Sequence, residues 1–306
     1  MARDDASDQC CLKMADVKGL VEAIHAIKSP NKNQLCMLSV NRDGLSLKWE
    51  DSSKGMQSSM WLHSELFSEY GCPWVQRGFG LHFGQFMDTL NVFALGSGAE
   101  LVLRFPGANE ELICEMTENG SVAQLCTYAR INTVEVPFTG DFMDAWEDPS
   151  SFFLMSSALL KEAVEDLEWA SGGTSVALLI KRNPVQITLS AQGIGELLIA
   201  LPADSLDGFS CAAAEVCHRY KQKHLRTAFT QLPSAKDNAS AVSSKVTIDK
   251  EGLMKVTHML SLGGNEVPYR TQVVLSAQPD TQRNALASGR CVIQFVIVSE
   301  LELNEE

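Results

Sequence analysis

The chain has 306 residues, of which 45% are hydrophobic and 21% charged, and its formal net charge at pH 7 is −13. This composition is typical of a globular protein with room for two modest domains, and the acidic balance repels nucleic acid on average. Nine scattered cysteines are not the pattern of a secreted disulfide framework. No apolar run approaches the ~20 residues of a membrane helix, and the start carries no secretory signal. We therefore expect a cytosolic or nuclear protein that does not bind membranes.

The first half begins with a polar start, residues 1–14, which we expect to be unanchored. An amphipathic helix is predicted at 16–28, because apolar residues recur there at helical spacing and Asp16 can cap it. Two β-runs follow, joined at an Asp43-Gly44 corner of the kind found in hairpins. The other elements predicted in this half are a β-run at 56–62, a strand at 79–83, a helix at 84–95 and strands at 100–105, 111–116 and 122–131.

Residues 132–150 show no sustained periodicity and contain prolines, a glycine and several acids. We expect an extended connector between two domains, because such a stretch cannot bury a face of its own. Its aromatic residues Phe138, Phe142 and Trp146 are predicted to hold it against a domain surface and to contribute to partner binding.

The second half repeats the order of the first. The elements predicted there are a helix at 156–169, strands at 176–181, 185–190, 196–201 and 213–219, a helix at 221–232, and strands at 245–249, 253–260 and 271–277. This repetition indicates a duplicated α+β fold with mainly antiparallel sheets, each half placing two helices on a sheet. The predicted domains are 1–131 and 151–278. A β-run at 291–298 falls outside this plan, so residues 279–306 are left as a C-terminal extension of unknown role.

Motifs of common enzyme sites are missing from the sequence. It contains no P-loop for phosphate, no Cys-x-x-Cys pair and no Gly-x-Ser-x-Gly turn. We therefore predict no catalytic residue, no metal site and no cofactor. Glu162, Asp166 and Glu168 could supply the carboxylates of a two-metal exonuclease. A solvated acidic helix face is the simpler interpretation of these residues.

Several short segments carry a family likeness. The capped helix at 156–169, the SAQGIG corner at 190–195 and the PADS segment at 202–205 resemble the second domain of eukaryotic sliding clamps of the PCNA type. The stretch 132–169 and the basic helix within 218–232 are similar to the Rad-one subunit of the nine-one-one DNA-damage checkpoint clamp. The likeness covers residues 12–278 and rests on ordered pattern rather than on one diagnostic motif.

That resemblance implies a duplicated DNA-clamp fold and a non-enzymatic subunit of a heterotrimeric ring in the nucleus. The ring would enclose double-stranded DNA at damage sites, with Rad-nine-like and Hus-one-like subunits as neighbours. A clamp loader, and the checkpoint and repair proteins that the ring recruits during the cell cycle, would be further partners. A 3′–5′ exonuclease, an activity suggested for this branch, and a homotrimeric replicative processivity clamp are the alternatives.

The resemblance also implies roles for individual residues. The bases expected to face DNA are Lys18, Lys161, Arg219, Lys221, Lys223 and Arg226. The strand residues expected at the subunit interfaces are Val122, Leu125, Thr127, Leu197, Ile199 and Leu201. Without the resemblance, a solvated basic helix and ordinary half-buried strands would explain both sets. Because few bases line the predicted hole, we expect weak, salt-sensitive DNA binding by the unloaded chain.

Overall fold

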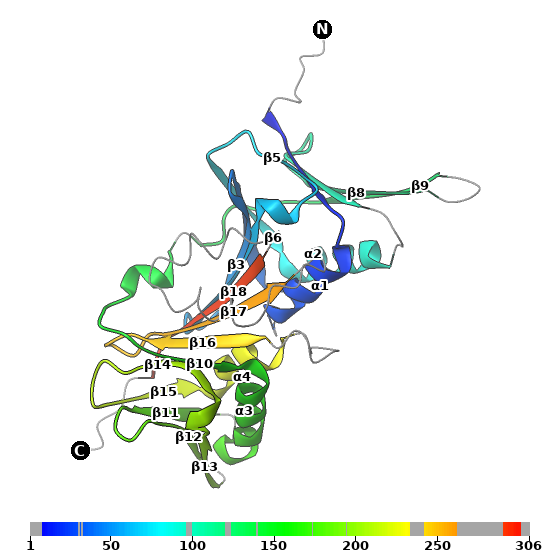
Figure 1. Cartoon of the computed structure of the whole chain (residues 1–306). Coiled ribbons are helices and arrows are strands. Elements are labelled where there is room, and N and C mark those ends of the chain that lie inside the picture. Colours follow the sequence, from blue (N-terminus) through cyan, green and yellow to red (C-terminus); the bar gives the residue numbers. More distant parts are fainter. Residues whose placement is uncertain are drawn as a thin grey trace.

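The computed structural model describes residues 8–29, 31, 33–95, 100–119, 124–138, 140–172, 174–193, 195–232, 242–261 and 290–300. Within these ranges the chain forms four α-helices and three antiparallel sheets (Figure 1). The sheets contain five, nine and four strands.

Each half of the chain contributes the same series of elements. The first half contains β1 (Cys10–Met14), α1 (Val17–Ala26), β2 (Leu35–Asn41), β3 (Gly44–Glu50), β4 (Met56–His63), β5 (Glu69–Gly71), β6 (Gln76–His82), α2 (Phe83–Ala94), β7 (Leu101–Phe105), β8 (Leu112–Asn119) and β9 (Gln124–Ile131). The second half contains β10 (Ser151–Ser156), α3 (Ser157–Ser171), β11 (Ser175–Lys181), β12 (Gln186–Gln192), β13 (Glu196–Leu201), β14 (Leu206–Ser210), β15 (Glu215–Lys221), α4 (Gln222–Thr230), β16 (Ser243–Ile248), β17 (Met254–Ser261) and β18 (Arg290–Ile297).

The sheets repeat this duplication strand by strand. The five-stranded order β5-β1-β7-β8-β9 has its counterpart in β14-β10-β16-β17-β18. The four-stranded order β6-β2-β3-β4 likewise corresponds to β15-β11-β12-β13. Antiparallel pairing of β18 with β4 joins a five-strand set of the second half to a four-strand set of the first, which creates the nine-stranded sheet. The expected duplicated α+β fold is therefore confirmed.

The strand β18 has a different place from the one that the sequence suggested. Residues 291–298 were left outside the duplicated plan, but β18 occupies the position in the second half that β9 occupies in the first. Its inward side chains Cys291, Ile293 and Phe295 are fully buried. The strand predicted at 271–277 lies outside the described residues. The long stretch of chain between β17 and β18 hid this order in the sequence.

The N-terminal segment also differs from expectation. Residues Cys10–Met14 were expected to belong to an unanchored start, but β1 lies between β5 and β7 in the five-stranded sheet. Its alternation explains the placement, because Cys10, Leu12 and Met14 are buried and the residues between them are not.

The helices pack in two pairs, α1 with α2 and α3 with α4, and all four lie on one side of the nine-stranded sheet (Figure 1). The carboxylate of Asp16 caps α1 as expected, accepting from the Gly19 amide at 2.8 Å. Trp49 of β3 is buried beneath α1, and its indole nitrogen donates to the Ile27 carbonyl at 2.5 Å. Alternate residues of β3 therefore face the helices, and those between them face the opposite side.

A chain of buried hydrogen bonds connects α4 with β17, β16 and α3 of the same half. The Nε2–H of His258 donates to the Ala228 carbonyl at 2.8 Å, so its Nδ1 accepts from the Ser244 hydroxyl at 2.8 Å. Ser157 at the start of α3 extends this chain through a 2.6 Å contact with Ser244. Burial lowers the pKa of His258 to about 4, which keeps the ring neutral at physiological pH. The ring also contacts Phe295 edge to face.

If β18 completes the core, truncating one of its inward side chains should destabilise the whole protein. We expect Phe295→Ala to lower the free energy of unfolding by about 3–5 kcal/mol, because it leaves a cavity in the core beside His258. Val298→Ala, one residue beyond the strand and 41% exposed, is the matched control and should change it by less than about 0.5 kcal/mol. Urea denaturation of the full chain measures both, and equal effects would contradict the central role of β18.

Candidate DNA-facing helices and subunit edges

The exposed face of α4 carries two bases, Lys223 and Arg226, opposite the buried Leu225 and Phe229. Both bases form ion pairs. The Lys223 ammonium lies 3.3 Å from Asp51, and the Arg226 guanidinium contacts Glu168 of α3. The positive charge that the sequence predicted for this helix is therefore present, but carboxylates partly neutralise it.

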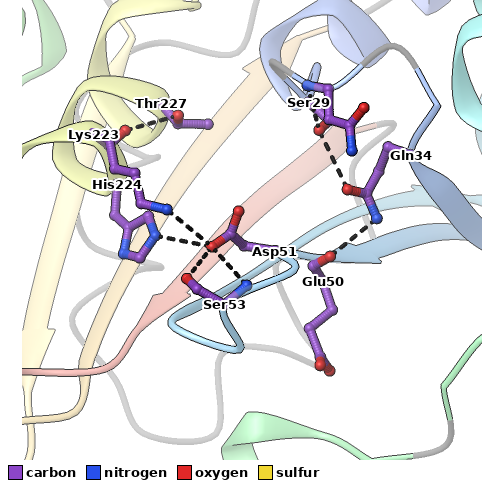
Figure 2. A network of polar contacts seen from close by, with 9 residues as sticks. Ser29, Gln34, Glu50, Asp51, Ser53, Lys223, His224 and Thr227 are labelled. Atoms are coloured by element: carbon purple, nitrogen blue, oxygen red, sulfur yellow. Dashed lines mark hydrogen bonds and ion pairs between the residues drawn. The ribbon is translucent and has the colours of Figure 1, made fainter.

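Asp51 lies in the turn between β3 and β4 and connects the two halves of the chain. Figure 2 shows its carboxylate receiving hydrogen bonds from Ser53, Lys223 and His224. Partial burial would raise the pKa of Asp51, but these donors and the nearby ammonium outweigh it and lower the pKa to about 2. The carboxylate is thus ionised throughout the physiological range and holds α4 against the first half.

His224 is the buried member of this network. Its Nε2 lies 3.3 Å from the Asp51 carboxylate, so this nitrogen carries the proton. Burial and the neighbouring Lys223 lower the pKa of His224, and Asp51 opposes them. Its Nδ1 is buried and has no hydrogen-bond partner among the described residues. Gly55 packs so closely that an added Cβ would lie 2.6 Å from the His224 ring.

The other predicted DNA-facing residues are spread over different surfaces. Lys18 lies on the exposed face of α1, and Lys161 is half-buried on α3. Arg219 and Lys221 belong to β15 and flank the fully buried Tyr220, so alternation directs them to the side of the sheet away from the core. The structure thus brings only Lys223 and Arg226 together on α4, and DNA contact by any of the six remains a prediction.

The helix layer as a whole is not basic. α4 contributes a charge of +2, from two bases and no acid. α1 has one base and one acid, α2 has one acid, and α3 has one base and four acids. The four helices together therefore have a net charge of −2. Such a surface can guide a phosphate backbone locally at α4. It cannot supply the many phosphate contacts that tight unaided binding requires.

Each of the three sheets ends in two strands that have one side unpaired within the sheet, and two of these terminal strands are β9 in the five-stranded sheet and β13 in the four-stranded sheet. Their counterparts β18 and β4 pair with each other inside the chain. The consequence for burial is direct. On β4 the inward Met60 and Leu62 are at most 1% exposed. The inward Leu197 and Ile199 of β13 are only partly buried, although they pack against the core. The unpaired edges of β9 and β13 therefore have the form of the β18–β4 pairing with one of the two strands absent.

The predicted interface residues fall on these two strands. Thr127 of β9 is half-buried and Leu201 of β13 is buried. Leu125 belongs to β9, opposite Glu118 of β8, while Val122 lies outside the described residues. Their contact with another subunit remains a prediction.

Sequence reasoning did not single out the exposed apolar residues of these strands. Leu198 of β13 is 63% exposed and Tyr128 of β9 is 46% exposed. The strict alternation within ELLIAL and CTYARI was the signal that could have found them, because it assigns neighbouring residues to opposite faces.

The connector crosses the face of the nine-stranded sheet that lies opposite the helices. It starts at the side of β6, where Val134 and Gly80 exchange two backbone hydrogen bonds of 2.9 Å. It then passes β3 and β4, where Asp141 pairs with Lys48 at 2.6 Å and the Gln57 side chain bonds the connector backbone. Lys48 on β3 and Gln57 on β4 alternate with residues that face the helices. The connector that they contact therefore lies on the opposite face of the nine-stranded sheet.

The aromatic residues of the connector were predicted to hold it to a domain surface. The Lys255 ammonium of β17 lies 4.6 Å from the Trp146 ring centre, which confirms the contact for this residue. Phe142 begins a short 3₁₀ turn, and both Phe142 and Phe138 are half-buried. The backbone amide of Glu147 then donates to Asp249 in the β16–β17 turn.

The carboxylates considered for a nuclease do not form a cluster. Glu162 and Asp166 are exposed on α3, and Glu168 pairs with Arg226. In the described part of the chain, no group of three or more His, Cys, Asp or Glu side chains is placed to bind a metal ion. No described helix is long and apolar enough to cross a membrane.

Replacing Asp51 tests the link between the halves. We expect Asp51→Asn to lower the free energy of unfolding at pH 7 by about 1–2 kcal/mol, because charge-assisted hydrogen bonds to Lys223 and His224 weaken. The folded-state pKa of Asp51 is about 2 against an ordinary 3.8, so this stabilisation is present above pH 3.8 and lost as pH falls toward 2. The difference between variant and wild type should therefore shrink in denaturation curves below pH 4. Asp43→Asn, which replaces an exposed acid in the β2–β3 turn, is the control and should change the free energy of unfolding at pH 7 by less than about 0.5 kcal/mol.

Comparison with solved structures shows which fold this is. PCNA from Thermococcus kodakaraensis matches with a TM-score of 0.67 at 16% identity, covering 95% of this chain and 100% of that chain. The PCNA2–PCNA3 complex from Sulfolobus tokodaii matches with a TM-score of 0.66 at 13% identity over 95% and 99% of the two chains. Proliferating cellular nuclear antigen from Entamoeba histolytica matches with a TM-score of 0.67 at 15% identity over 95% and 98%. The fold is therefore that of the DNA clamps.

Sequence comparison is more specific about the family. A search of curated protein sequences gives no match. The family model described as repair protein Rad1/Rec1/Rad17 matches residues 12–260, which is most of the chain and nearly all of both sheet-and-helix halves. The chain therefore belongs to the Rad1/Rec1/Rad17 repair protein family and has the fold of a DNA sliding clamp.

Proposed function

We propose that this chain is a non-enzymatic subunit of a nuclear, heterotrimeric ring that encloses double-stranded DNA at damage sites. The observation that carries the proposal is the pair of free strands β9 and β13. Their counterparts β18 and β4 already form a seven-residue antiparallel joint within the chain. Pairing β9 of one subunit with the β13 equivalent of the next would repeat this joint, and three such contacts would close a ring.

The neighbours in the proposed ring are two homologous clamp subunits, Rad-nine-like and Hus-one-like. The matched Sulfolobus tokodaii structure is a complex of two different clamp chains, which supports mixed assembly within this fold. We propose that the subunit comprises domains 1–131 and 151–278 and that β18 completes the second of them.

The proposed ring would hold DNA by enclosure. Its helix layer has a net charge of −2, and only Lys223 and Arg226 concentrate positive charge there. A closed ring does not require strong phosphate contacts for retention, so weak local attraction is sufficient to centre the duplex. A clamp loader would then be required to open and place the ring.

Recruitment would use the opposite face. The connector lies on the side of the sheet away from the helices, and Phe138, Phe142 and Trp146 belong to it. Aromatic residues on an accessible segment are typical of peptide-binding surfaces. We propose that checkpoint and repair proteins bind there while DNA passes on the helix side.

Retention on DNA tests the enclosing ring and the role of α4 together. The chain, coexpressed with its two homologous clamp subunits and loaded onto a nicked circular plasmid, should withstand high salt and be released when the plasmid is linearised. Lys223→Gln with Arg226→Gln should leave this retention unchanged. The same pair should weaken DNA binding by the unloaded complex and lower its salt slope by about two, because each phosphate contact releases about one ion.

Lys181→Gln is the matched control, since Lys181 is an ion-paired base on β11 outside the helix layer. If Lys181→Gln weakened DNA binding as much as the double variant does, α4 would not be the DNA-facing surface. If high salt released the wild-type ring from the circular plasmid, the ring would not enclose DNA. Glutamine is used because charge reversal would place a negative charge directly beside Asp51 and Glu168.

A charge on the exposed face of β13, the strand with the unpaired edge, tests subunit pairing. Leu198→Asp should leave the isolated chain folded, because this side chain is 63% exposed. It should weaken assembly with the neighbouring subunit by about tenfold or more, because a charge would replace an apolar cross-strand contact on the outer face of the extended sheet. Leu197→Asp is less informative, because Leu197 packs against the subunit's own core. Circular dichroism checks the fold and size-exclusion light scattering the assembly; unchanged assembly of Leu198→Asp would refute this pairing.

A further inference from the structure

The joint inside the chain contains a second contact, made by helices above the paired strands. Gln231 caps the C-terminal end of α4, and its side-chain amide, oriented with the nitrogen toward α1, donates to the carbonyls of Lys28 and His25 at 2.9 and 3.2 Å. The end of α4 therefore meets the end of α1 beside the place where β18 pairs with β4.

The duplicated order of elements shows where the matching helix ends lie at the free strands. α2 corresponds to α4 and α3 corresponds to α1. α2 packs beside β9, and α3 packs beside β13. Leu95 caps α2 as Gln231 caps α4. When β9 of one subunit pairs with a β13 equivalent, the end of its α2 should therefore meet the end of an α3-type helix.

Both of these helix ends expose large apolar side chains. Leu95 is 87% exposed and Val92 is 58% exposed at the end of α2, while Trp169 is 60% exposed in the last turn of α3. These three residues are among the nine exposed large hydrophobics of the described residues. Two more of the nine, Tyr128 of β9 and Leu198 of β13, lie on the opposite face of the strands beside these helices. Exposed apolar residues at two complementary helix ends are typical of surfaces covered in an assembly.

The Trp169 side chain is held in place before any partner binds. The β12–β13 corner packs against it so closely that a Cβ on Gly195 would lie 2.6 Å from the indole ring. The backbone amide of Gly195 also points to the Ala170 carbonyl of α3 at 3.5 Å. One side of the indole is therefore supported by the subunit's own turn and the other is exposed. A supported aromatic side chain of this kind loses little conformational entropy on binding.

We propose that Trp169 docks against the apolar C-terminal end of the α2-type helix of the neighbouring clamp subunit. This inference rests on the ring assembly proposed above and names a second contact within it. Inside the chain, the ends of α4 and α1 meet through the polar side chain of Gln231. Between subunits, the equivalent helix ends would meet through apolar side chains instead. The same logic places Val92 and Leu95 against the α3-type helix end of the other neighbour.

The charges around these ends select a different chain over a second copy of this one. Asp88 is the only charged residue of α2 and lies one turn before Val92. Glu165 and Asp166 lie one turn before Trp169 and are exposed. Two copies joined head to tail would bring acids to both sides of the contact, which disfavours association. The neighbour of Trp169 is therefore a homologous clamp chain whose α2 end is apolar and not acidic.

Coexpression with the two homologous clamp subunits, followed by titration of the purified chains, tests this contact. Trp169→Ala should weaken binding of one neighbour by about tenfold or more, as expected for a central aromatic anchor. Its melting temperature as an isolated chain should match that of the wild type, because the side chain is largely exposed. Gly195→Ala should weaken the same neighbour by displacing the indole, and Trp169→Phe should restore most of the affinity. Val75→Ala is the matched control, an 80% exposed residue outside the helices and outside β9 and β13, and should bind as the wild type does.

Wild-type affinity of Trp169→Ala, while Leu198→Asp loses assembly, would overturn this contact and leave the ring intact. Failure of the wild-type chain to bind either homologous subunit would overturn the ring and this contact together. Equal weakening of both neighbours by Trp169→Ala would also contradict the proposal, because the residue lies at only one of the two free ends.

Discussion

The structure depends on the antiparallel pairing of β18 with β4. This one joint merges strands from the two halves into a nine-stranded sheet, buries the inward residues of both strands and brings α4 beside α1. Asp51 adds an ionic contact between the same halves. Because the joint is formed by backbone hydrogen bonds, its geometry can be repeated wherever the equivalent strands are free. The chain therefore contains an internal example of the contact that we propose for β9 and β13 with neighbouring subunits.

The two faces of this sheet are used differently. The helices cover one face and carry the few bases that DNA could meet, and the connector crosses the other through polar contacts with β3, β4 and β17. In the proposed ring, this separation means that a protein bound at the connector would not compete with DNA for space. The acidic surface elsewhere limits nonspecific attraction to nucleic acid, so selection of DNA would come from assembly and loading of the ring.

Much of the fold could be predicted from the sequence, because apolar periodicity and turn residues are local signals. The duplicated order, the four helices and the Asp16 cap follow from such signals. The place of β18 could not be predicted in this way, since its partner β4 is far away in the chain. The ion pairs that occupy Lys223 and Arg226 are equally nonlocal, because their acids belong to other elements. At β13 the strand was recognised, but core-facing Leu197 was not distinguished from exposed Leu198.

The late position of β18 in the chain has a consequence for synthesis. The ribosome completes β4 long before it reaches residue 290, so the nascent first half presents β4 with its outer side unpaired. At that stage both β4 and β9 have an unpaired side, so in the proposed ring a neighbouring subunit translated nearby would meet two similar strands. Correct assembly of that ring would require β18 to pair with β4 first, which happens only after the C-terminal strand has left the ribosome.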